Sequence, residues 1–294
     1  MVFFTRKGFP VGAFFTIVQE ESRRRKKNKH DKKILFPILV VNFLFMLSKS
    51  EVKYIQSLHQ KKFRDNHGVF VAEGPKVVAE LIDQHIFPLK KIYAIESWFL
   101  ENGASLQLKN EQVSIVKDHE LEKISFLTTP NQVLAIFGYR SESEFSPNES
   151  KVTLMLEEIR DPGNFGTIIR TADWFGINDI VCSVNCVDMY NPKVVQSTMA
   201  SLGRVNVFYT SLSHVLDKFS HLPLYATALT GQSLNAVEVK KPSFLLIGNE
   251  GSGVSPKMLE RADKLLTIPG EGGAESLNAA VATGILLYAF TRFR

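Results

Sequence analysis

The sequence predicts an α/β protein of two domains, because apolar runs of strand length alternate with amphipathic helical stretches along most of the chain. A polar stretch at residues 141–151 contains Pro147, has no apolar face and predicts an interdomain linker. The chain has 294 residues, of which 45% are hydrophobic and 22% charged, which is enough apolar material for a core in each half. We therefore expect domains at 48–140 and 152–294.

The first 47 residues differ from both expected domains. A cationic run at 22–33 is followed by nearly continuous apolar residues at 34–47. That apolar run is too short for a helix to cross the roughly 30 Å core of a bilayer, and no small-residue cleavage site follows it. We expect 1–47 to be an untranslated or disordered extension, with translation starting at Met46. The alternative is a basic arm or a membrane anchor.

The positive charge of the chain is concentrated in this first segment. Residues 1–45 contain 10 Lys and Arg against 3 Asp and Glu, so the remaining residues carry a net charge of −2 although the whole chain is at +5. Binding of RNA therefore needs a local basic patch. The best candidate lies at the start of the first domain and consists of Lys49, Lys53, Lys61, Lys62 and Arg64. An ordinary solvated helix face explains these residues equally well.

Helix and strand signals alternate through the first domain. A helix is expected at 51–64 and another at 75–84, where Pro75 suits a first helical turn. Strands are expected at 68–74, 90–97, 112–117 and 131–139, where the residues are mostly apolar. A short helix at 118–125 is expected between the last two strands.

The second domain contains apolar runs typical of buried parallel strands, at 152–159, 178–184, 223–229 and 244–250. Open parallel sheets bind ligands in the loops at the carboxyl ends of their strands. Three loops at such positions carry unusual residues, so these loops are the candidate active site.

The first of these loops, at 160–176, ends a strand in a Pro-Gly turn and enters a helix. Asn164 and Gly166 lie at the start of that helix. Arg170 lies one turn further along and can point back towards the same loop. The alternative is a tight turn beside a solvated or salt-bridged arginine.

The other two loops are rich in glycine. One contains Gly248 and Glu250, and its glycine spacing matches neither the dinucleotide-binding fingerprint nor the Walker A loop. The other follows Pro269 and leads through Ser276 into a helix rich in small residues. The hydroxyl group of Ser276 is expected to cap that helix.

Together the three loops resemble the motifs of the SpoU family of SPOUT RNA methyltransferases, in the same order and with similar spacing. The matching residues are Asn164, Gly166 and Arg170 in the first motif, Gly248, Glu250 and Gly253 in the second, and Ile268, Pro269, Ser276, Leu277 and Asn278 in the third. The third motif departs from the family at Gly270, where a methionine is common. The stretch 70–74 is similar to part of the substrate-binding domain that many members carry.

The resemblance implies the fold and the assembly. It implies a C-terminal SPOUT fold with a deep trefoil knot and a mainly parallel sheet, preceded by a small ribosomal-protein-like α/β domain that binds the substrate. It also implies a homodimer whose active sites draw on both subunits.

The resemblance further implies S-adenosylmethionine as the cofactor and methylation of a ribose 2′-hydroxyl of RNA, with ribosomal RNA preferred over transfer RNA. No metal is implied, because no cluster of histidines or carboxylates accompanies the loops. The implied catalytic residues are Arg170, Asn164, Glu250, Ser276 and Asn278. The implied cofactor-binding residues are Gly248, Asn249, Ile268, Leu277, Thr227 and Ala228.

The role of Arg170 can be narrowed by chemistry. The family assigns proton abstraction to the matching arginine, but a guanidinium group with a pKa above about 12 is a poor base. We expect Arg170 to bind the phosphate of the target nucleotide and to stabilise the developing alkoxide. The other polar residues of the three motifs would position Arg170, the ribose and the loops.

The second domain also contains two basic residues that are candidates for RNA contacts, and two cysteines. Lys193 and Arg204 lie in a stretch that follows the family pattern, and each would contact an RNA phosphate or be a solvated helix charge. Cys182 and Cys186 lack the further ligands of a zinc site, so we expect reduced, buried thiols in a cytoplasmic protein. No stable membrane association is expected.

The sequence leaves three alternative functions open. They are methylation of a transfer RNA ribose, methylation of a base nitrogen by a related knotted enzyme, and RNA binding by a catalytically silent paralogue. The presence of every polar motif residue argues against the silent paralogue. A nucleotide-dependent oxidoreductase is disfavoured, because the glycine spacing does not fit a dinucleotide.

Overall fold

The computed structural model describes residues 47–141 and 143–292. The predictions made for residues 1–46 lie outside the described residues. Within the described part the chain forms two sheets, one of four strands and one of six, each combined with helices. The predicted α/β class is therefore confirmed.

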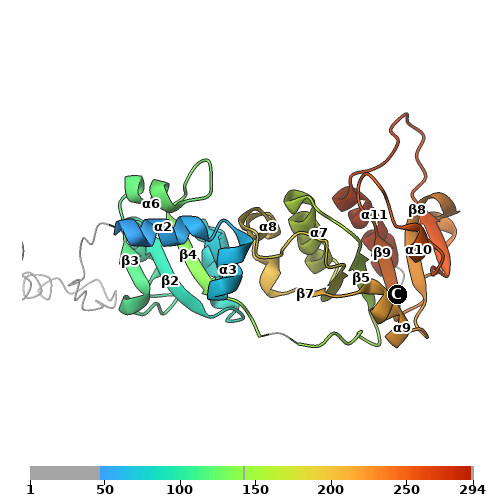
Figure 1. Cartoon of the computed structure of the whole chain (residues 1–294), viewed down its shortest axis with the longest axis horizontal. Helices are drawn as coiled ribbons and strands as arrows, with labels where there is room; N and C mark the ends of the chain where they lie inside the picture. Colours follow the sequence, from blue (N-terminus) through green and yellow to red (C-terminus); the bar gives the residue numbers. More distant parts are fainter. Residues whose placement is uncertain (1–46, 142, 293–294) are drawn as a thin grey trace, which may run out of the picture. The chain divides into compact units, whose positions relative to one another are not determined.

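The first sheet has the strand order β1-β4-β2-β3, in which β1 and β2 run antiparallel to β4 and β3 runs parallel to β2. Its strands are β1 (Val69–Glu73), β2 (Leu89–Ala94), β3 (Val113–Ile115) and β4 (Val133–Gly138). The helices of this domain, most of them labelled in Figure 1, are α2 (Lys49–Ser57), α3 (Lys61–His67), α4 (Pro75–Asp83), α5 (Glu96–Asn102) and α6 (Asp118–Ile124), with a 3-10 turn at Asn110–Gln112.

Helices cover both faces of this sheet, as the strand pattern requires. Phe70 and Ala72 of β1 belong to the core cluster that includes α4, whereas Val69 and Val71 belong to the cluster that includes α2 and α6. Successive side chains of a strand point to opposite faces, so every residue of β1 is buried. This explains why the first four residues of the strand form a continuous apolar run.

The helix predicted at 51–64 is two helices, α2 and α3, and this corrects the prediction. No proline or glycine marks the break between Ser57 and Lys61. The Nη1 atom of Arg64 donates hydrogen bonds to the carbonyl oxygens of Leu58 at 2.9 Å and His59 at 2.8 Å. Arg64 therefore satisfies carbonyl groups that the end of α2 leaves without helical partners.

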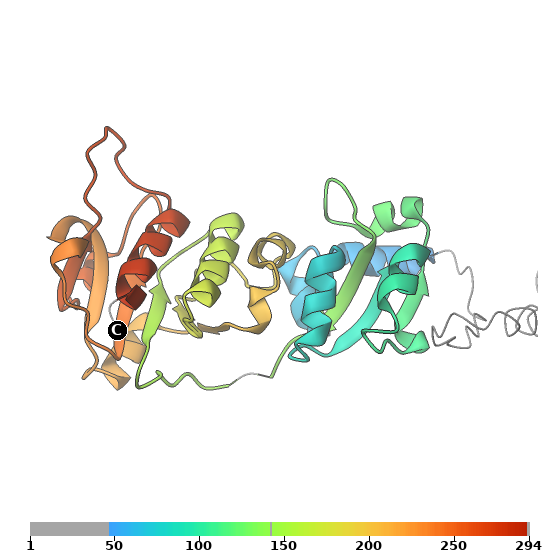
Figure 2. The ribbon, with the colours of Figure 1, turned by 180° about the vertical axis from the view of Figure 1, so that it is seen from behind.

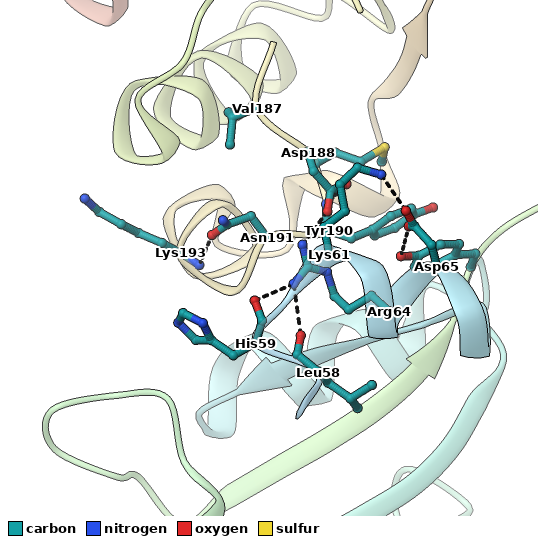
Figure 3. A network of polar contacts seen from close by, with 12 residues as sticks. Leu58, His59, Lys61, Arg64, Asp65, Val187, Asp188, Tyr190, Asn191 and Lys193 are labelled. Carbon is teal, nitrogen blue, oxygen red and sulfur yellow. Dashed lines mark hydrogen bonds and ion pairs between the residues drawn. The ribbon is translucent and has the colours of Figure 1, made fainter. Parts of the chain in front are cut away.

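Arg64 also joins the two domains, as Figure 3 shows. Its Nη2 atom lies 2.5 Å from Oδ2 of Asp188, and the two side chains are only 2% and 11% exposed. The ring of Tyr190 stacks nearby on Phe70 and on Tyr139, with centroid distances of 4.9 and 4.0 Å. The prediction that Arg64 binds RNA is corrected, because its guanidinium group is buried and paired within the protein.

The second sheet consists of parallel strands in the order β10-β8-β9-β5-β6-β7. Its strands are β5 (Val152–Leu156), β6 (Asp179–Cys182), β7 (Asn206–Tyr209), β8 (Leu224–Ser233), β9 (Ser243–Ile247) and β10 (Lys264–Thr267). The helices are α7 (Pro162–Trp174), α8 (Pro192–Thr198), α9 (Leu212–Lys218), α10 (Pro256–Leu259) and α11 (Ala279–Arg292), with 3-10 turns at Ser201–Gly203 and Leu234–Ala236.

Helices also cover both faces of the second sheet. Residues of α7, α8 and α11 share one core cluster with alternate residues of β5, and residues of α9 and α10 share another with Met155. Figures 1 and 2 show α7 and α11 side by side, and the two helices are in contact. Among residues 47–141 and 143–292, no helix has the length and hydropathy needed to cross a bilayer.

The strand order places a switch point between β5 and β9. The chain adds β6 and β7 on one side of β5, and then β8, β9 and β10 on the other side, with β9 next to β5. In a parallel sheet the loops at such a reversal diverge and leave room for a ligand at the carboxyl ends of the strands. The first two motif loops follow β5 and β9, so the fold brings them together.

Candidate active site

Three residues from three separate motifs form a hydrogen-bonded series at this switch point. The Nδ2 atom of Asn278 donates to Oδ1 of Asn164 at 2.9 Å, and Nδ2 of Asn164 donates to Oε1 of Glu250 at 2.7 Å. These residues are 114 and 86 positions apart in the chain. The structure thus brings together three of the predicted site residues, and each amide group orients the next.

The first motif is positioned by the start of α7. Asp161 caps this helix, because its carboxylate accepts a hydrogen bond from the backbone N–H of Asn164 at 2.8 Å, and Pro162 occupies the first turn. A Cβ atom at Gly166 would lie 2.6 Å from the side chain of Ser197 and 2.8 Å from a carbonyl oxygen of α8. The glycine therefore serves close packing of α7 on α8. Asp161 was not among the predicted residues, although an aspartate before proline is a helix-start signal.

The second motif folds back on itself as a tight loop. The backbones of Asn249 and Gly253 exchange two hydrogen bonds, at 3.1 and 2.9 Å. The side chain of Asn249 accepts from the N–H groups of Gly251 and Ser252 and donates to the carbonyl oxygen of Glu158 at 2.9 Å. Asn249 was predicted to bind the cofactor, and in this structure its side chain shapes the loop and joins it to the end of β5.

Replacing Gly248 with alanine is expected to weaken cofactor binding by at least about fivefold, because overpacking of a close contact costs about 1–3 kcal/mol. A Cβ atom at this position would lie 2.2–2.3 Å from backbone atoms of Gly253 and Val254, so the loop would have to open. Calorimetric titration with S-adenosylmethionine measures the effect. Gly251→Ala is the matched control, since the nearest atom to its Cβ is 3.5 Å away. Equal affinities of the two variants would contradict the prediction.

The third motif departs from the prediction in one detail. Asn278, and not Ser276, caps α11, because Oδ1 of Asn278 accepts from the N–H groups of Ala280 at 3.0 Å and Val281 at 3.3 Å. Ser276 and Leu277 are exposed, and no contact within the described part of the chain fixes Ser276. Asn278 therefore has two functions, the helix cap through its oxygen and the link to Asn164 through its nitrogen.

Arg170 lies on α7, six residues after Asn164, and its side chain is exposed. Within the described residues it forms no ion pair. A guanidinium group that is exposed and unpaired, on the same helix as Asn164, is available to an anionic ligand. This placement fits the predicted role of Arg170.

The predicted cofactor residues lie on or directly after three neighbouring strands. Thr227 and Ala228 belong to β8, Gly248 follows β9, and Ile268 follows β10. The pairing of β8 with β10 jumps from Ala226↔Leu265 to Gln232↔Leu266, so β8 bulges between these positions. Such a bulge frees backbone groups for a ligand.

Exposed apolar side chains accompany this bulge. Leu229 and Leu277 are 79% and 45% exposed. A site with free backbone groups and uncovered leucines suits a nucleoside, which combines an apolar base face with polar edges. The residues therefore fit S-adenosylmethionine. Among the described residues no group of three His, Cys, Asp or Glu side chains is arranged to bind a metal.

The predicted RNA-binding residues differ in their exposure and in their ion pairs. Lys49, Lys53, Lys61 and Lys62 are exposed, and Lys61 pairs with Asp65 at 2.7 Å. Lys193 is 65% exposed and lies 4.0 Å from Asp161 at the start of α7. Arg204 forms ion pairs with Glu80 and Asp173. Its donor groups are therefore engaged within the protein, which corrects the prediction of a free phosphate contact.

The two cysteines are free and buried, as predicted. Burial raises the pKa of Cys182 well above its usual value. A hydrogen bond from Cys182 is the main cause that lowers the pKa of Cys186 to about 7. Neither thiol belongs to the motif loops.

Fold and site together define the class of this protein. A parallel α/β sheet with the series Asn278–Asn164–Glu250 at its switch point, and an unpaired arginine on the helix of Asn164, is typical of a SPOUT methyltransferase. Residues 151–288 match the SpoU rRNA Methylase family, and residues 49–135 match the MRM3-like substrate binding domain. The chain belongs to the SpoU rRNA methylase family. The resemblance found in the motifs is therefore confirmed.

Known proteins similar to this chain agree with that assignment. It is 30% identical to the 23S rRNA (guanosine(2553)-2′-O)-methyltransferase RlmP of Bacillus subtilis over 81% of this chain and 94% of the relative. It is 26% identical to the 23S rRNA (uridine(2479)-2′-O)-methyltransferase of Streptomyces viridochromogenes over 81% and 87%. The crystal structure of an AdoMet-bound rRNA methyltransferase from Sinorhizobium meliloti matches with a TM-score of 0.74 and 31% identity over 83% of this chain and 96% of that one.

Proposed function

We propose that this protein transfers the methyl group of S-adenosylmethionine to a ribose 2′-hydroxyl of ribosomal RNA. The observation that carries the proposal is the series Asn278–Asn164–Glu250 at the carboxyl edge of a parallel sheet, with the exposed Arg170 on the same helix as Asn164. The activities named for the Bacillus and Streptomyces relatives support ribose methylation of ribosomal RNA.

The cofactor would be bound by the residues around the bulge of β8. Backbone groups of Thr227 and Ala228 and of the loop at Gly248 would hydrogen-bond its polar edges, and Ile268 and Leu277 would cover its apolar faces. When bound, S-adenosylmethionine supplies an electrophilic methyl group on its sulfonium. The hydrogen bonds of Asn249 keep the loop after β9 in the shape that such binding needs.

The polar residues would orient and activate the ribose. Methyl transfer to an alcohol is an in-line displacement, so the 2′-oxygen must be placed accurately and its developing negative charge stabilised. Arg170 would bind the target phosphate and face this charge. Asn164 and Glu250 would keep α7 and the second loop in register, and Asn278 would fix the start of α11 beside them.

Nucleoside analysis tests the proposal directly. Ribosomal RNA from cells that lack the gene is incubated with the protein and S-adenosylmethionine, then digested and examined by mass spectrometry. We expect one 2′-O-methylated nucleoside to appear. A methylated base would indicate the rival nitrogen chemistry, methylation of transfer RNA alone would change the substrate, and no binding of S-adenosylmethionine in calorimetry would indicate a silent RNA-binding paralogue.

RNA would reach the site from the first domain. The exposed lysines at positions 49, 53, 61 and 62 lie on α2 and α3 and at their connection, and Lys193 lies beside the capped start of α7. Such residues contact phosphates without reading sequence. The match of residues 49–135 to a substrate-binding domain supports this assignment. It also supports a division of the chain into two domains at the linker 141–151.

The proposed assembly is a homodimer. The exposed face of α11 carries an apolar stripe of Val281 (52% exposed), Ile285 (38%) and Tyr288 (51%), and Trp174 at the end of the neighbouring α7 is 84% exposed. The spacing of four and three residues places the stripe on one helix face. α11 starts at Asn278 and α7 carries Arg170, so a second copy on this face would lie close to both active-site helices.

Replacing Ile285 with glutamate is expected to convert the dimer into a monomer, because a charge in the centre of an apolar interface is costly to bury. Multi-angle light scattering measures the mass of both proteins. Leu100→Glu is the matched control, since Leu100 is 59% exposed on α5 of the first domain. Wild-type protein with the mass of a monomer would contradict the proposed assembly.

The deep trefoil knot and the cytoplasmic location also belong to this proposal. Similarity in fold to the Sinorhizobium enzyme over most of both chains supports a SPOUT arrangement, in which a knot is expected. The two free thiols are compatible with a reducing compartment such as the cytoplasm.

A further inference from the structure

Arg204 lies at the centre of an ion-pair network that joins three elements. Its Nη1 atom is 2.5 Å from Oε1 of Glu80 on α4 of the first domain. Its Nε and Nη2 atoms are both 2.8 Å from Oδ2 of Asp173 on α7. Nη2 also donates to Oγ of Ser201 at 3.3 Å.

Of the two acidic partners of Arg204, Asp173 is the one on α7, the helix that carries Arg170. It lies three residues after Arg170 on α7, and side chains at this spacing are neighbours on a helix surface. Its Oδ2 atom also accepts a hydrogen bond from Ser201 at 2.7 Å. The carboxylate is therefore oriented towards Arg204 and Ser201, and Arg170 on the same helix stays without an ion pair among the described residues.

Removing Arg204 would leave the Asp173 carboxylate without its main cationic partner. The side chain of Asp173 is 22% exposed. A carboxylate that loses its partner on one side pairs with the next cation within reach, and the nearest one along α7 is Arg170. An Arg170 paired in this way would be less available to a phosphate or to a developing alkoxide.

We propose that Arg204 is a positioning residue for methyl transfer: by engaging Asp173 it keeps Arg170 free for the substrate. This inference rests on the catalytic role given to Arg170 in the proposed function. The geometry assigns a second consequence to the same residue, because Glu80 belongs to the domain that would bind RNA. Arg204 therefore connects the position of that domain to the helix that carries Arg170.

The energetics of the network are consistent with this role. Partial burial opposes the charge of Arg204, but the hydrogen bonds to Asp173 and Glu80 outweigh it and raise the pKa of Arg204. The arginine side chain is 40% exposed, and those of Glu80 and Asp173 are 32% and 22% exposed. The pairs are thus partly shielded from water, which strengthens them relative to fully solvated pairs.

Three variants test the proposal through the rate of methyl transfer to ribosomal RNA from cells that lack the gene. Arg204→Gln is expected to lower kcat about tenfold through the loss of free Arg170. Adding Asp173→Asn to that variant removes the competing carboxylate, so kcat is expected to return to within about threefold of wild type. Arg204→Lys keeps a charge for Asp173 and is expected to lie in the same range.

A role of Arg204 in stability alone would give a different pattern, because the double variant lacks the same ion pairs and would not recover. An unchanged kcat in Arg204→Gln, or no recovery in the double variant, would overturn the proposal. Arg261→Gln is the matched control, since Arg261 pairs with Asp217 on α9 and contacts neither α7 nor the first domain. Urea midpoints for each variant separate loss of folding from loss of rate.

Glu80→Gln separates the two consequences of the network. It removes the partner in the first domain and leaves the pair with Asp173, so we expect a higher KM for RNA with kcat retained to within about twofold. A tenfold fall in kcat in this variant would overturn the assignment of Asp173 as the relevant partner. If Arg170→Ala retained full turnover, the catalytic role proposed for Arg170 would be wrong. That result differs from the results that would overturn the role of Arg204, so the two failures can be distinguished.

Discussion

Replacing Arg170 with alanine is expected to lower the rate of methyl transfer by at least about a hundredfold, the usual effect of removing a group that stabilises charge in a transition state. The guanidinium group is exposed and unpaired within the described residues, so its removal leaves no buried charge behind. The affinity for S-adenosylmethionine is expected to stay unchanged, because the cofactor residues lie within β8 and directly after β9 and β10, and not on α7.

The measurement is single-turnover methylation of ribosomal RNA together with calorimetric titration of the cofactor. Arg170→Lys is the matched variant, since it keeps the positive charge and loses the planar fork that binds a phosphate with two hydrogen bonds. We expect its rate to fall between those of wild type and Arg170→Ala. Turnover of Arg170→Ala like that of wild type would remove this residue from the mechanism.

Replacing Arg64 with alanine is expected to lower the free energy of unfolding by about 3–5 kcal/mol, as for other buried ion pairs that lose one partner. Three interactions disappear together: the pair with Asp188 and the hydrogen bonds to the carbonyl groups of Leu58 and His59. Asp188 is 11% exposed, so its carboxylate would be left nearly buried without its cationic partner. Urea denaturation followed by circular dichroism measures the loss.

The double variant Arg64→Met, Asp188→Leu is the control for this prediction. Apolar side chains of similar volume remove both charges, so we expect much of the stability to return. Arg261→Ala provides a comparison on the surface, where loss of the pair with Asp217 should cost less than about 1 kcal/mol. If Arg64→Ala also lowered the free energy of unfolding by less than about 1 kcal/mol, the pair of Arg64 with Asp188 would not have the importance given to it.

The local sequence pattern was sufficient for most elements and for the identity of the motif residues. β1, α4 and β4 were predicted, because their apolar spacing and the proline of α4 are local signals. The strand β7 and the break between α2 and α3 were not predicted. Of the four residues of β7 only Val207 is buried, so the strand lacks a clear apolar pattern. The break between α2 and α3 depends on hydrogen bonds from Arg64, which apolar periodicity does not reveal.

The active site also combines residues that were predicted from the sequence with contacts that depend on the fold. Asn164, Glu250 and Asn278 were chosen from motifs, and their side chains meet because β5 and β9 are adjacent at the switch point. Ser276 was expected to cap α11, and the structure gives that role to Asn278, since serine and asparagine both suit a cap and only the helix start decides between them.

The α/β class could be predicted from the sequence because it depends on apolar periodicity, and the family could be predicted because the three motifs resemble those of the SpoU family in order and spacing. Which charged residues are free became clear only from the folded chain. Arg64 and Arg204 looked like Lys53 or Arg170 in the sequence, but contacts over 124 residues pair them with Asp188 and Glu80. Whether a cation can meet a substrate depends on its partners in space, which the order of residues does not state.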